Sequence, residues 1–122
     1  MSVMTGLHLH HTGGAYTANS IDLNSYHRAV QGDGTVVSGK WSILDNAAGR
    51  ITKGQYAAHT LNANTGKIGL AMCAMGGGEW RDPRACKFFP VREQVDAFIA
   101  EAARLCLTWD IKVTRKTVLT HA

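Results

Sequence analysis

The chain has 122 residues, of which 45% are hydrophobic and 18% are charged. That length accommodates one domain with one core, and the composition excludes a wholly disordered chain. The net charge of +4 indicates a mild attraction to polyanions. Because the basic residues are scattered, with Arg115 and Lys116 the only adjacent pair, we expect no nucleic-acid partner.

The first predicted element is a strand over residues 6–11, GLHLHH. Side chains alternate between the two faces of a strand. One face would carry Leu7, Leu9 and His11, and the other His8 and His10. Thr12 and two glycines end the strand, so three of the chain's six histidines fall within one short segment.

Residues 12–66 predict one short helix, one hairpin and a long loop. A helical turn is expected after Asn19 or Ser20. Residues 26–39 predict a β-hairpin, because two extended runs flank the Gly-Asp-Gly turn at 32–34. Residues 40–66 have no sustained period, so we expect them to be mostly loop.

The second half predicts a strand, a loop, a helix and a last strand. The apolar run 68–75 is typical of a central strand buried on both faces, and residues 76–89 predict a surface loop. Residues 90–109 predict an amphipathic helix. Its apolar stripe comprises Val91, Val95, Phe98, Ile99, Ala102, Leu105, Cys106 and Trp109. A β-branched strand from residue 116 closes a single α/β domain, with a mixed central sheet flanked by helices.

The cysteines and the apolar runs indicate the redox state of the thiols and whether the sequence contains a membrane or export segment. Cys73, Cys86 and Cys106 cannot all pair within one chain, so we expect reduced thiols, with Cys73 and Cys106 buried as small hydrophobic side chains. No apolar run reaches membrane-spanning length or resembles an export signal. We therefore expect neither a membrane anchor nor a signal peptide.

Two histidines lie near the ends of the first and last predicted strands. If those strands are neighbours in one sheet, His10 and His121 could point into one cleft and hold part of a zinc site. Water bound to catalytic zinc attacks a carbonyl that the metal also polarises. Two distant histidines often meet by chance, so hydrogen-bonded or surface histidines remain the alternative.

Five segments in order resemble the zinc-dependent N-acetylmuramoyl-L-alanine amidases, a family that includes the amidase-type phage lysozymes. The peptidoglycan recognition proteins share its fold. The segments are LHLHHTGG, YHRAVQGDGTVVSG, AAHTLNANTGKIGLAMCAMGG, QVDAFIAEAARLC and TVLTHA, and together they span nearly the whole chain. The resemblance implies a hydrolase that cleaves the amide between N-acetylmuramic acid and L-alanine of peptidoglycan.

The resemblance also assigns roles to single residues. It implies that His10 and His121 bind Zn²⁺ and that Tyr26 is the catalytic tyrosine. Three further residues would line the substrate groove: His59, Asn64 and Thr65. The alternatives are a cross-strand packing role for Tyr26 and a backbone-capping role for His59. We expect His8 and His27 to be solvated or hydrogen-bonded side chains.

The sequence departs from the family at its end. Similar amidases continue past the second histidine to a third ligand, Asp or Cys, preceded by a lysine, whereas this sequence stops one residue after His121. We favour an enzyme domain over residues 1–122 whose C-terminal end is missing; the alternative is a non-catalytic peptidoglycan-binding module. The resemblance to phage lysis enzymes implies a monomer that stays cytoplasmic until it is released to the cell wall.

Overall fold

The computed structural model describes residues 4–60, 63–77 and 86–120, and these form a mixed five-stranded sheet in the order β3-β2-β4-β1-β5. The strands are β1 (Gly6–His11), β2 (Arg28–Val30), β3 (Val36–Ser38), β4 (Lys67–Met72) and β5 (Val118–Thr120). β1 pairs in parallel with both β4 and β5. β2 pairs in parallel with β4 and antiparallel with β3. The prediction of a mixed α/β fold is confirmed.

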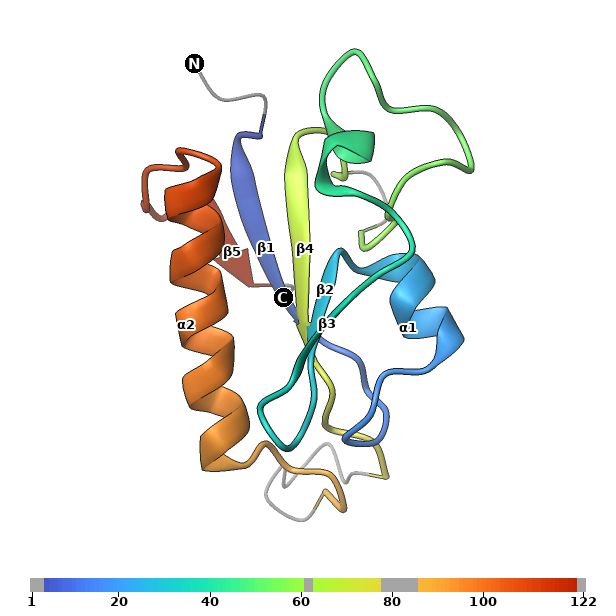
Figure 1. Ribbon diagram of the computed structural model, residues 1–122, viewed down its shortest axis with the longest axis vertical. Coiled ribbons are helices and arrows are strands. Elements are labelled where there is room, and N and C mark those ends of the chain that lie inside the picture. Colours follow the sequence, from blue (N-terminus) through green and yellow to red (C-terminus); the bar gives the residue numbers. More distant parts are fainter. Residues whose placement is uncertain (1–3, 61–62, 78–85, 121–122) are drawn as a thin grey trace.

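The sheet stands between α2 (Arg92–Thr108) on one side and α1 (Ser20–Ser25) with the segment 40–66 on the other (Figure 1). Leu7 of β1 is fully buried, and the partly buried Leu9 packs on the same core as Phe98 of α2. The largest fully buried hydrophobic side chains of this core are Met4, Leu7, Val30, Ile68, Leu70 and Leu105. The alternation predicted for β1 therefore sends its leucines to the core and leaves His8 and His10 on the opposite face.

The short helix and the hairpin form where the sequence predicts them. Asn19 caps α1, because its Oδ1 accepts a hydrogen bond from the backbone N of Asp22 at 2.8 Å and the Asp22 carboxylate accepts from the backbone N of Asn19 at 3.1 Å. β2 and β3 form the hairpin around residues 32–34, where Gly34 adopts a φ of 88°. Segment 40–66 contains one 3₁₀ turn, η1 (Ile43–Asn46), and is otherwise irregular.

The four central residues of β4 are buried, as predicted, but the strand ends at Met72 instead of Met75. Cys73 N still donates to Val30 O at 2.9 Å, and Met75 then turns into the left-handed region with a φ of 75°. Such a φ is incompatible with a continuing strand. The three cysteines are free and buried, and no described helix is long and apolar enough to cross a membrane.

α2 buries most of the stripe predicted for it, but one apolar residue of the stripe is exposed and two polar residues are buried. Ile99, placed on the apolar stripe, is 61% exposed, whereas Gln94 and Glu101 are buried. The Gln94 amide donates to Val30 O at 3.0 Å and to Cys73 O at 2.7 Å, and it thereby satisfies carbonyl groups at two strand ends. Glu101 accepts hydrogen bonds from Arg104. A stripe defined by apolar residues alone misses these paired polar groups.

β5 confirms one step of the zinc argument, since the first and last strands are neighbours. The register sets Leu9 opposite Thr120, so β5 reaches the residue before His121 beside the residue before His10. His121 itself lies outside the described residues, and its predicted partnership with His10 stays a prediction.

Candidate functional site

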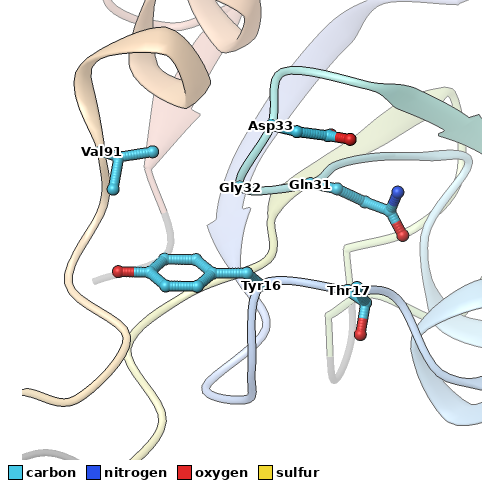
Figure 2. A pocket seen from close by; sticks show the side chains of 6 residues that line it. All are labelled: Tyr16, Thr17, Gln31, Gly32, Asp33 and Val91. Atoms are coloured by element: carbon cyan, nitrogen blue, oxygen red, sulfur yellow. The ribbon is translucent and has the colours of Figure 1, made fainter.

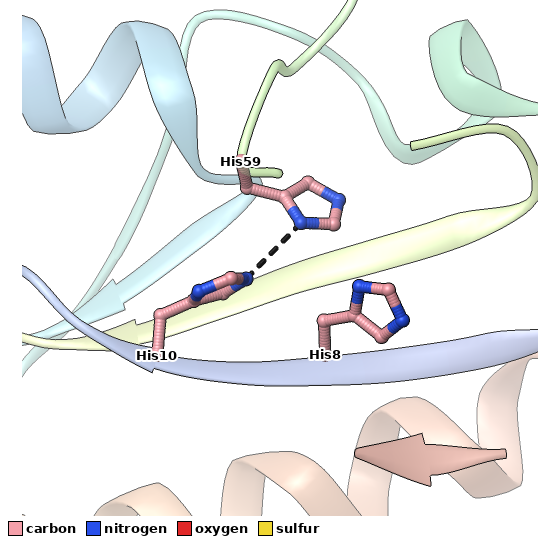
Figure 3. Close-up of side chains that lie close together, drawn as sticks. All are labelled: His8, His10 and His59. Atoms are coloured by element: carbon pink, nitrogen blue, oxygen red, sulfur yellow. Dashed lines mark hydrogen bonds between the residues drawn. The ribbon is translucent and has the colours of Figure 1, made fainter. Parts of the chain in front are cut away.

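Three buried histidines gather on the face of the sheet opposite the leucine core. His8 and His10 project from β1, and His59 reaches them from the segment 40–66 (Figure 3). Their exposed fractions are 7%, 6% and 7%. One ring nitrogen from each lies within 4.8 Å of the other two. We call these three residues the histidine cluster.

The hydrogen bonds of His59 define which of its nitrogens carries the proton. Its Nε2 lies 3.3 Å from the carbonyl of Lys67, which can only accept, so Nε2 is the protonated nitrogen. Nδ1 of the neutral ring then accepts from His10 Nε2 at 3.1 Å. Burial, the largest effect, lowers the pKa of His59 to about 3, against the opposing effect of the Lys67 carbonyl. His59 is therefore a neutral imidazole near neutral pH, with a lone pair facing His10.

Gly69 of β4 provides the space that the His59 ring occupies. A Cβ at Gly69 would lie 2.6 Å from both Cγ and Cδ2 of His59, which is shorter than any real contact. Gly69 is also the register partner of His8. The missing side chain thus lets a loop histidine lie directly against the sheet, beside the histidines of the next strand.

Asn64 fixes the backbone around His59. Its Oδ1 accepts from His59 N at 3.1 Å and from Thr60 N at 2.9 Å, and its Nδ2 donates to Thr60 O at 2.9 Å. Asn64 is 7% exposed, whereas Thr65 is exposed. In this structure the Asn64 side chain is engaged in holding the loop that carries His59, while Thr65 is open to solvent.

His27 and Asn46 form a second buried pair under this loop. Gly69 N donates to His27 Nδ1 at 2.9 Å, so His27 Nε2 carries the proton and donates to Asn46 Oδ1 at 3.0 Å. Burial lowers the pKa of His27 to about 4, although the Asn46 hydrogen bond opposes this. Both ring nitrogens are engaged, and His27 is the hydrogen-bonded histidine expected from the sequence.

Tyr26 follows α1 and brings a phenol to the cluster. Its ring centroid lies 5.3 Å from that of His10. Burial raises the pKa of Tyr26 above its ordinary value, and the negative charge of Asp22 raises it further. The hydroxyl therefore stays protonated at neutral pH and is a hydrogen-bond donor.

The structure brings together three of the predicted site residues, His10, Tyr26 and His59. His8, expected to be a solvated or hydrogen-bonded side chain and given no role in the site, is buried within the cluster. Its place was readable from the alternation of β1, which puts residues 8 and 10 on one face. The sequence alone gives no sign that a loop histidine would cover His8, because that contact depends on Gly69.

Two hollows lie apart from the centre of the cluster. One, of about 380 Å³, is shown in Figure 2 and is lined by Tyr16, Thr17, Gln31, Gly32, Asp33 and Val91. The Tyr16 hydroxyl donates to Phe89 O at 2.6 Å beside it. The other, of about 240 Å³, lies where β1, β4 and β5 end, and its lining includes His10, His11 and Thr120.

No protein-family model matches the sequence, and no curated protein matches it. Among solved structures, a similar chain occurs in the ectodomain complex of the peptidoglycan recognition proteins LCa and LCx, which was solved with tracheal cytotoxin bound. The TM-score is 0.61. The alignment covers 99% of this chain and 72% of that chain at 17% sequence identity. At that identity the likeness concerns the fold. The chain thus has the mixed α/β fold of a peptidoglycan recognition protein.

Proposed function

We propose that this chain binds peptidoglycan fragments beside the histidine cluster and hydrolyses the amide between N-acetylmuramic acid and L-alanine with the help of Zn²⁺. The observation that carries the proposal is the convergence of His10, His59 and Tyr26 at one place on a fold shared with a peptidoglycan recognition protein. The five-segment resemblance to the zinc amidases supports the same reaction.

The donor set of the cluster suits zinc. Zinc binds imidazole nitrogen, and metal-ligating histidines commonly donate their second ring N–H to a carbonyl, as His59 does to Lys67. His10 is the ligand common to the resemblance and to the cluster. When bound, zinc supplies Lewis acidity, which polarises a carbonyl and lowers the pKa of water toward neutrality.

The chain's own residues would contribute orientation and hydrogen bonding. The protonated Tyr26 hydroxyl can donate to the amide carbonyl oxygen as negative charge grows on it, and such a donor stabilises the transition state more than the ground state. Burial of His8, His10 and His59 excludes bulk water and strengthens each of these interactions. The net charge of +4 favours approach to an anionic wall.

A second candidate is recognition of muropeptide without hydrolysis. It is favoured by the fold neighbour, a recognition protein complex with tracheal cytotoxin bound. Under either candidate we propose one amidase-like domain over residues 1–122 that acts as a monomer. As the lysis enzymes of phages do, it would stay cytoplasmic until it reaches the wall.

One experiment separates the candidates. The chain is incubated with purified cell wall and with a soluble muramoyl peptide, with Zn²⁺ or with a chelator, and new L-alanine amino termini are quantified alongside wall pull-down. Zinc-dependent release of amino termini supports the amidase, and pull-down without release supports the binding module. Absence of both would refute the proposal.

A further inference from the structure

The histidine cluster contains more nitrogen ligands than the resemblance requires. The resemblance draws on His10 from β1 and on His121 near the end of the sequence, and it leaves His8 unused. In the structure, however, His8 is as well buried as His10 and belongs to the same three-nitrogen group. The three imidazoles are buried together, and one nitrogen of each lies close enough to the others to share a single metal ion.

We propose that His8, His10 and His59 together form a transition-metal site that needs no contribution from His121. The site would take Zn²⁺, or Co²⁺ or Ni²⁺ in its place, rather than Mg²⁺ or Ca²⁺, because its donors are imidazole nitrogens instead of oxygens. This goes beyond the proposed function, since the ion would bind whether or not the chain hydrolyses any substrate.

The donor atoms follow from the hydrogen bonds. Nε2 of His59 is engaged with Lys67 O, so His59 would bind through Nδ1, the atom that faces His10. His10 would bind through Nε2, so its neutral ring would carry its proton on Nδ1 instead, and the hydrogen bond from Nε2 to His59 would be lost. The 3.1 Å between these two nitrogens is already close to the separation of about 3.3 Å that two ligands keep around a tetrahedral zinc with bonds of about 2.0 Å.

His8 needs the larger adjustment. Its ring centroid lies 5.5 Å from that of His59 and 6.3 Å from that of His10. The nitrogens lie within 4.8 Å of one another, so closure to tetrahedral spacing calls for movement of at most about 1.5 Å, which side-chain rotation can supply. Because β1 pairs with a strand on each side, its backbone need not move.

The remaining position of a three-histidine site would stay open, as in catalytic zinc sites. Tyr26 lies beside His10, at a ring separation of 5.3 Å. The site would thus offer one exchangeable position, and a residue with a protonated hydroxyl packs beside one of its ligands. That arrangement serves any ligand with a carbonyl or carboxylate oxygen.

The test is metal binding by the 122-residue chain in the absence of substrate. Zn²⁺ affinity is measured by competition with a chromophoric chelator, and Co²⁺ is used as a spectroscopic probe of coordination. The variants are H8A, H59A and H121A, with H11A as the matched control because His11 is an exposed neighbour on the same strand. We expect one ion per chain, a loss of at least about tenfold in affinity for H8A and H59A, and a change below twofold for H121A and H11A.

Long-range ¹⁵N NMR of the imidazoles of the unmodified chain provides a measurement that does not depend on the folding of any variant. Addition of Zn²⁺ should shift the ring nitrogens of His8, His10 and His59 and leave those of His11 and His27 in place. The proposal is overturned if the chain takes up no Zn²⁺. It is also overturned if His121 responds while His8 and His59 do not, or if H121A removes binding that H8A retains. A chain that binds the ion through the cluster yet releases no stem peptide would refute the amidase and leave this site standing.

Discussion

Replacing Asn46 by alanine is expected to destabilise the chain strongly, although Asn46 lies in a segment that the sequence predicts as loop. Its side chain is fully buried and makes four hydrogen bonds. Oδ1 accepts from His27 Nε2 and from Ala57 N, while Nδ2 donates to Ala57 O and Asn64 O. The alanine variant removes the amide from all four partner groups, of which Asn64 O keeps a hydrogen bond from Lys67 N at 3.1 Å.

The cost follows from the number of orphaned groups. Each buried polar group that loses its partner costs about 1–3 kcal/mol, and water entering the space recovers part of this, so we expect a loss of about 4 kcal/mol. Small domains are stable by only about 5–15 kcal/mol. With a urea dependence of about 1.5 kcal/mol per molar, the unfolding midpoint should fall by between about 2 and 3 M.

The assay is urea unfolding followed by circular dichroism, with a chelator present so that metal binding does not contribute. Asn24→Ala is the matched control, because Asn24 is exposed on α1. Its free energy of unfolding should change by no more than about 0.5 kcal/mol. If Asn46→Ala loses less than about 1 kcal/mol, the buried amide does not hold the 57–64 segment against the sheet, and the account of how His59 is positioned fails.

Three further predictions concern the neighbours of this network. In the metal-free chain, the His27 pKa of about 4 lies below the ordinary 6.5, so the unfolded state binds more protons between these values. Stability is full above about pH 6.5 and falls toward pH 4, by up to about 3 kcal/mol from His27 alone, and the lowered pKa of His59 acts in the same direction. A urea midpoint that is flat over this range would contradict the assignment. Gly69→Ala should displace the His59 ring and weaken Zn²⁺ binding at least about tenfold, measured by chelator competition, whereas Gly14→Ala, whose Cβ would meet nothing closer than 3.6 Å, should not. Tyr26→Phe should lower amide release about 10²-fold at unchanged zinc content; full activity would remove Tyr26 from the mechanism.

The fold was predictable because its strands have strong local patterns. Alternation in residues 6–11 separates leucine from histidine, the Gly-Asp-Gly turn defines the hairpin, and the apolar run after Lys67 marks the central strand. Each of these signals acts over a few residues. Strand order and the two buried polar residues of α2 depend on partners far away in the sequence, and local patterns do not report them.

The candidate site was predictable only in part, for the same reason. His10, Tyr26 and His59 follow from the five-segment resemblance, and the structure brings them together. The inclusion of His8 depends on the absence of a side chain at Gly69, a residue about sixty positions away. Asn46 shows the same limit, since nothing in the local sequence indicates that its side chain is buried and makes four hydrogen bonds.

The residues of the histidine cluster lie on two different kinds of backbone. His8 and His10 lie on a strand hydrogen-bonded along both edges, whereas His59 lies on an irregular excursion between η1 and β4. An ion bound by all three histidines would therefore connect the segment that carries His59 to β1. Part of the binding free energy would offset the conformational entropy that this segment loses. Metal binding should therefore slow amide hydrogen exchange and proteolytic cleavage in the segment from η1 to β4. Exchange in β1 should be slow with or without the ion and should change little.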